Sequence, residues 1–221
     1  MEPERHAWAP SYDCDMASIL TAQRDAAESI AACVAAVIKP VDAVTRAIPL
    51  PARPMAPEVV EAYLLARSEL LKMSAEGLGN ALGYLREITV KAPDFAPGLA
   101  LYAACLGSLG YWGHAPIRDV YPGVKQLALR ALALDDSLDV AHLVLGMASW
   151  MIDWDLAAAE QKLLRAIELG PSNSDVYTFR AIFLSHVGRL SEAAAQVQYA
   201  LRLDPASLFP NHAAANIQRW E

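Results

Sequence analysis

The chain has 221 residues, of which 55% are hydrophobic and 19% are charged, and its formal net charge is −7. This composition is typical of a folded protein and excludes a largely disordered chain. The acidic balance offers no basic surface for nucleic acid or for an anionic membrane, so the sequence predicts that neither is a partner.

No targeting or membrane signal is visible in the sequence. The start, "MEPERHAWAP", lacks a basic region followed by an apolar one and does not read as a signal peptide. The longest apolar run, residues 30–38, has about half the length that a bilayer span needs. Cys14, Cys33 and Cys105 have no metal-ligand spacing, which predicts reduced, mostly buried thiols. These features together predict a cytoplasmic protein.

The first predicted element is a helix over residues 15–38, which carries few charges and ends at Lys39-Pro40. Five prolines lie between residues 40 and 57, a density that blocks a continuous helix and favours an extended linker. The predicted organisation is therefore an N-terminal segment (1–38), a proline-rich linker (39–57) and a C-terminal region (58–221).

Beyond the linker the sequence predicts helices and no strands, because no run of β-branched residues alternates with polar ones. The fold class is therefore all-α. The predicted helices span residues 58–73, 76–91, 95–109, 121–135, 138–152, 155–169, 173–187, 191–203 and 210–220.

The C-terminal region repeats a pattern of small and larger apolar residues. "AAAEQKLLRAIELGP" (157–171) and "AAAQVQYALRLDP" (193–205) carry matching residues 34 positions apart. The matching residues are Ala159, Leu163, Ala166 and Pro171 in the first, and Ala193, Val197, Ala200 and Pro205 in the second. Two earlier stretches fit the same pattern, with Ala81, Leu85, Ile88 and Pro93, and with Val124, Ala128, Ala131 and Asp136.

The step from Pro93 to Asp136 is 43 residues, and we expect its extra residues in the loop "GYWGHAPIRDVYPG" (110–123). The pattern thus predicts four units, 58–93, 94–136, 137–171 and 172–205, followed by a capping helix within 207–221. A period of 34 residues with a proline after the second helix resembles the tetratricopeptide repeat. The resemblance implies an α-solenoid of about four helical hairpins, in which each hairpin is completed by its neighbour.

A narrower resemblance covers nearly the whole chain. "WAPSYDCDMASILTAQRDAAESIA" (8–31) resembles a segment of bacterial adenylate/guanylate cyclase-like proteins and membrane-bound winged-helix regulators, in which a proline-rich linker and tetratricopeptide repeats follow. The matching residues are Trp8, Ala9, Tyr12, Asp13, Asp15, Gln23 and Ala27. No stretch resembles their cyclase or DNA-binding domain. The resemblance therefore implies a signalling-type repeat array that acts as an adaptor or has been put to a new use.

In such an array the first helix of each unit lines the inner wall, and here the expected wall is almost wholly apolar. The predicted groove residues are Ala100, Ala104, Leu143, Met147, Trp150, Met151, Phe179, Ile182 and His186. No Lys, Arg or Asn is expected on the wall, which disfavours a clamp for a charged tail. The groove is predicted to take an apolar guest: residues 15–38, a partner's helix or peptide, a second copy in a homodimer, or a hydrophobic small molecule.

The sequence favours a non-catalytic interaction module, with no cofactor and no metal, because it has no nucleophile motif, no Gly-rich phosphate loop and no zinc pattern. Trp150 and Trp154 are predicted as core residues, His142 as a surface histidine and Asp155 as a helix cap. The alternative is a small enzyme or carrier that uses the groove as a pocket. Its candidate residues are Trp150, Asp153, Trp154, Tyr177 and His186.

Overall fold

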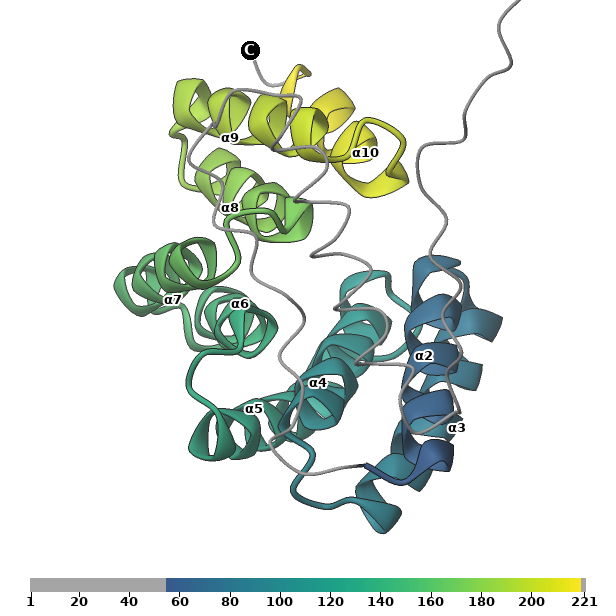
Figure 1. The fold of residues 1–221 in the computed structure, drawn as a ribbon. Helices are drawn as coiled ribbons and strands as arrows, with labels where there is room; N and C mark the ends of the chain where they lie inside the picture. Colours follow the sequence, from purple (N-terminus) through teal and green to yellow (C-terminus); the bar gives the residue numbers. More distant parts are fainter. Residues whose placement is uncertain (1–54, 220–221) are drawn as a thin grey trace, which may run out of the picture. The chain divides into compact units, whose positions relative to one another are not determined.

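The computed structural model describes residues 55–219, which form helices and no strand (Figure 1). The elements are α2 (Pro57–Leu71), α3 (Ala75–Lys91), α4 (Ala96–Tyr111), α5 (Ile117–Leu134), α6 (Asp139–Ala148), η2 (Ser149–Asp153), α7 (Leu156–Leu169), α8 (Ser174–His186), α9 (Leu190–Leu203) and α10 (Leu208–Ile217). Every helix predicted beyond the linker is present. The helix predicted over residues 15–38 lies outside the described residues.

Most of the described residues belong to one compact unit, Glu61–Glu221, while the start of α2 belongs to the unit Met1–Val60. The division into N-terminal segment, linker and repeat units stays a prediction. None of the helices between residues 55 and 219 is long and apolar enough to cross a membrane.

Successive helices of the C-terminal unit pack in pairs, α4 with α5, α6 with α7 and α8 with α9. The first helices of neighbouring pairs also contact one another, since α4 packs on α6, α6 on α8, and α8 on α10. Each pair is thus completed by its neighbour, as expected of a helical repeat whose single hairpin does not cover its own apolar face.

The recurring small residues lie where two helices approach closely. Ala159 and Ala166 of α7 and the matching Ala193 and Ala200 of α9 are fully buried. On the facing helix α6, a Cβ at Gly146 would lie 3.0 Å from the Leu163 Cγ atom. Because the helices are this close, the 34-residue pattern reflects a packing requirement.

Helix α5 begins at Ile117, and residues 117–120, predicted as part of a loop, are helical. The prediction starts the helix at residue 121, which puts Pro122 in its first turn, whereas in the structure Pro122 lies in the second turn of α5. A proline at this position removes one hydrogen bond, to the carbonyl of Arg118. Burial compensates, because Tyr121 is 1% exposed and a Cβ at Gly110 of α4 would lie 2.9 Å from Val120. The extra residues of this unit therefore mostly lengthen α4 and α5.

Helix α6 ends in a π-helical turn, η2, and then in Trp154, whose φ of 56° is left-handed. The wider turn and the left-handed residue take Trp154 off the face that Trp150 occupies. Trp150 is buried, as predicted, whereas the prediction of a core position for Trp154 is wrong, because its side chain is 79% exposed. The next residue, Asp155, accepts a hydrogen bond from the Ala158 amide at 2.9 Å and caps α7, as predicted.

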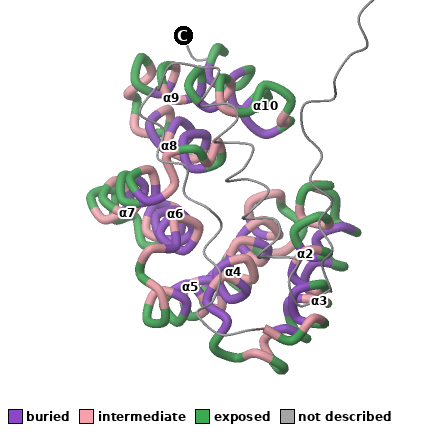
Figure 2. The backbone as a smooth tube through the Cα atoms, in the orientation of Figure 1, coloured by how far each residue is buried: buried purple, intermediate pink, exposed green. Residues whose placement is uncertain are grey.

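His142 is a buried residue of α6, and its prediction as a surface histidine is wrong. Figure 2 shows α6 buried along nearly its whole length, because neighbours pack around it. The His142 Nε2 atom lies 3.0 Å from the Asp136 carbonyl oxygen and donates to it, since a carbonyl only accepts. Burial lowers the pKa of His142, so its ring is neutral near pH 7.

Cys105 of α4 is a buried, free thiol, as predicted. Burial raises its pKa to about 12, which keeps the sulfur protonated and unreactive at neutral pH. Cys14 and Cys33 lie outside the described residues.

Candidate binding groove and a second pocket

A groove of about 610 Å³ lies along the first helices of the C-terminal unit. Most of its lining is apolar, and much of that lining comes from α4, α6 and α8. The apolar and aromatic lining residues are Leu70, Leu71, Met73, Leu78, Leu101, Ala104, Trp112, Tyr121, Val124, Val140, Leu143, Val144, Met147, Phe179, Ala206, Leu208 and Phe209. A volume of this size is within the range of pockets that hold a ligand or a run of guest side chains.

Polar side chains also line the groove, so the expectation of no Arg or Asn there is wrong. Arg67 of α2 and Asn173, Asp175 and Asp204 contribute to the lining. The predicted wall consists of the inner faces of three helices, whereas α2 and the turns before α8 and α10 also line the groove. Asn173 is engaged within the protein, because its amide donates to the Asp139 carboxylate at 2.8 Å and its side-chain oxygen accepts from the Asp175 backbone amide at 3.0 Å.

One end of the groove is acidic. Burial raises the pKa of Asp175, and the nearby carboxylates of Asp204 and Asp139 raise it further. Asp175 still presents an exposed surface to the groove. This end therefore favours a cation over an anion in any guest.

The structure divides the predicted groove residues into three groups. Ala104, Leu143, Met147 and Phe179 line the groove. Ile182 and His186 line a second pocket. The remaining three, Ala100, Trp150 and Met151, are buried or partly buried against their neighbours.

The residues proposed for an enzyme do not meet in one cavity. Tyr177 and His186 lie in the first and last turns of α8, about 14 Å apart along the axis. The Tyr177 hydroxyl donates to the Pro171 carbonyl at 3.1 Å, and Asp153 forms an ion pair with Lys125. Between residues 55 and 219, no group of three or more His, Cys, Asp or Glu side chains is placed to hold a metal ion.

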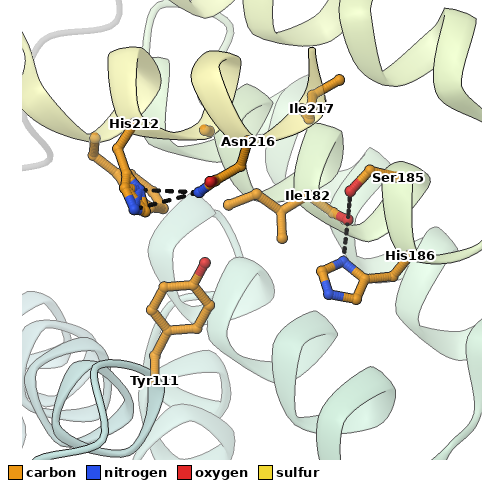
Figure 3. Close-up of a pocket in the computed structure, with 9 residues that line it drawn as sticks. Tyr111, Ile182, Ser185, His186, His212, Asn216 and Ile217 are labelled. Carbon is orange, nitrogen blue, oxygen red and sulfur yellow. Dashed lines mark hydrogen bonds between the residues drawn. The ribbon is translucent and has the colours of Figure 1, made fainter. Parts of the chain in front are cut away.

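The second pocket, of about 440 Å³, lies between the end of α4, the last turn of α8 and α10 (Figure 3). The sequence does not predict this pocket, because the predicted helix ends at residue 109, before Tyr111, and the last predicted helix serves only as a cap. Its lining consists of Tyr111, Ile182, Ser185, His186, Phe209, His212, Ala213, Asn216 and Ile217.

Comparisons with known proteins give matches among solved structures. No protein-family model matches the sequence, and no curated protein matches it. TTC0263, a thermophilic TPR protein in Thermus thermophilus, is 20% identical over 73% of this chain and 81% of that chain, with a TM-score of 0.58. MamA 41-end from Desulfovibrio magneticus RS-1 is 16% identical over 75% and 86% of the two chains, with a TM-score of 0.47. YrrB is described as a TPR protein with an unusual peptide-binding site. It is 18% identical over 74% of this chain and 76% of that chain, with a TM-score of 0.43.

The order of paired helices and the likeness to the Thermus protein define the class of fold. The C-terminal region is an all-α solenoid with the tetratricopeptide-repeat fold, which confirms the prediction. The narrower resemblance to cyclase-like and winged-helix regulator proteins stays a prediction.

Proposed function

We propose that this chain is a non-catalytic protein-interaction module whose groove binds an apolar helix. The observation that carries the proposal is the lining of the groove, where apolar side chains remain partly exposed on the first helices. Leu101 and Ala104 of α4, Val140 of α6 and Phe179 of α8 are examples. A contiguous apolar surface in a hollow of a protein marks an interaction site.

The occupant that we propose is residues 15–38 of the same chain. This stretch is apolar, with Met16, Ile19, Leu20, Ile30, Val34 and Val37 among its residues. The proline-rich residues 39–56 connect it to α2, and α2 itself contributes Arg67, Leu70 and Leu71 to the groove. At about 3.1 Å per residue in an extended conformation, this linker spans roughly 55 Å, more than twice the roughly 22 Å length of α2. The tether is therefore long enough to return the segment to the groove.

Burial of apolar surface favours occupancy of the groove by residues 15–38. Covering ~400 Å² of apolar surface contributes on the order of 10 kcal/mol before the entropy of ordering the segment is subtracted. A tethered segment also loses less translational freedom than a separate partner, because its effective concentration is high. A partner helix would therefore need to compete with residues 15–38.

Replacing Leu101 with Asp is expected to raise the rate of tryptic cleavage after Arg24 by about tenfold or more. Leu101 lines the groove and is partly exposed, and losing its apolar contact while adding a charge weakens binding by at least ~1.5 kcal/mol. When opening is fast, cleavage follows the population of the released segment. The measurement is the rate of each cut in the full-length chain, followed by mass spectrometry.

The chain supplies its own controls for this experiment. Cleavage after Arg46, within the proline-rich linker, should be unchanged by the substitution. Leu129→Asp, on α5 at a 58% exposed position that is not part of the groove lining, should leave the cut after Arg24 unchanged. Protection of Arg24 that grows with protein concentration would assign the groove to the segment of a second copy. Cleavage after Arg24 as fast as after Arg46 in the unaltered chain would overturn the assignment.

A further inference from the structure

The second pocket combines an aromatic wall with polar groups that face the space. Tyr111 lies 5.5 Å from Phe179 and 6.3 Å from Phe209, between ring centroids, and Phe179 lies 4.7 Å from Phe209. These rings come from α4, α8 and α10, so three helices hold the wall in place. Tyr111 and Phe209 line the pocket, while Phe179 lines the groove and packs against both rings. The partly exposed Tyr111 ring offers an apolar surface against which an aromatic ligand packs.

Several polar side chains of the second pocket have donors or acceptors that are not used in hydrogen bonds within the protein. The His186 Nδ1 atom lies 2.7 Å from the Ile182 carbonyl oxygen and donates to it, which leaves Nε2 as an acceptor in the neutral ring and as a second donor when the ring is protonated. The Tyr111 hydroxyl makes no hydrogen bond to another described residue, and in Figure 3 it points toward His212 and Asn216. One amide hydrogen of Asn216 is directed at His212, at 3.3 Å, and the other is free to donate elsewhere.

The charge of this pocket differs from that of the chain. The net charge is −7, yet no Asp or Glu lines the pocket. Its lining instead holds two imidazole rings, which become cationic donors on protonation, and three neutral donors, the Tyr111 phenol, the Asn216 amide and the Ser185 hydroxyl. The Ser185 hydroxyl is already engaged, since it donates to the Ile182 carbonyl at 2.7 Å. Burial raises the pKa of Tyr111, which keeps its hydroxyl protonated and able to donate.

We propose that the second pocket binds a small aromatic carboxylate. The ring of the ligand packs against Tyr111 and Phe209, and its carboxylate accepts hydrogen bonds from the Tyr111 hydroxyl and the Asn216 amide. In their protonated forms, the rings of His186 and His212 add positive charge to the lining of the same pocket. The pocket shares Phe209 with the groove, but this proposal does not depend on what occupies the groove.

The test is isothermal titration calorimetry of the full-length chain with 1-naphthaleneacetate and with its neutral isostere, 1-naphthaleneacetamide. The acetate should bind at least about tenfold more tightly than the amide, because hydrogen bonds to a charged acceptor are the stronger ones. Tyr111→Phe, which keeps the ring, should weaken acetate binding by about fivefold or more, and Asn216→Ala, at an exposed position, should weaken it in the same direction.

A matched control is Tyr199→Phe, a half-exposed tyrosine of α9 that is not part of the pocket lining; it should leave the affinity for the acetate unchanged. The proposal is overturned if the acetate fails to bind at millimolar concentration, if the amide binds equally well, or if both pocket variants bind like the unaltered protein. The tryptic cleavage after Arg24 should not respond to either pocket variant, which separates failure here from failure of the groove assignment.

Discussion

Leu163→Ala is expected to lower the free energy of unfolding by about 2–5 kcal/mol. Leu163 is 1% exposed and fills the space between α7 and α6, where a Cβ at Gly146 would lie 3.0 Å from it. The truncation leaves a cavity that the tightly packed helix pair closes only in part. The measurement is urea unfolding followed by circular dichroism at 222 nm.

The neighbouring leucine provides the control. Leu164 lies one residue further along α7 and is 41% exposed, so Leu164→Ala should change the free energy of unfolding by less than about 1 kcal/mol. Equal effects at the two positions would mean that α7 does not present the face assigned to it, and the repeat packing described for this unit would be wrong.

The second large loss of stability is expected from enlarging one of the recurring buried alanines. Ala193→Leu should destabilise the protein by about 1–3 kcal/mol, although leucine is a good helix former. Ala193 is fully buried in α9, at the position that Ala159 holds in α7, and added methylene groups would push neighbouring helices apart. Thermal and urea unfolding both report the change.

Ala195→Leu is the matched variant, because Ala195 lies two residues away in the same helix and is exposed. Its effect should stay within about 0.5 kcal/mol. A fully tolerated Ala193→Leu, with unfolding unchanged, would contradict the view that the small residues permit the close approach of helices.

The fold could be predicted from the sequence because the close packing of helices requires small residues at regular intervals. Ala159 and Ala193 lie 34 residues apart and are both buried, so the sequence pattern reflects the close approach of the paired helices. Where a helix departs from regular geometry, the pattern was less informative. A π-turn and a left-handed residue turn Trp154 outward, and a helix that tolerates Pro122 begins earlier than the proline suggested.

The groove was harder to predict than the fold, because its lining depends on which elements surround it in space. Residues on the inner faces of first helices, such as Met147 and Phe179, could be placed from helical periodicity. Arg67 and Asp204 could not, since α2 and the turn before α10 approach the groove only in the folded chain. The second pocket depends in the same way on Tyr111 and α10, which are remote from each other in sequence.

The most direct test of the account is photo-cross-linking from the groove of the full-length chain. A benzophenone amino acid replaces Val140, a partly exposed groove residue of α6, and the products are mapped by mass spectrometry in dilute solution. We expect cross-links within one chain from position 140 to residues 15–38, and none when the same amino acid replaces Leu129 on α5. Efficient photolysis at position 140 without any cross-link to residues 15–38 would contradict the central claim.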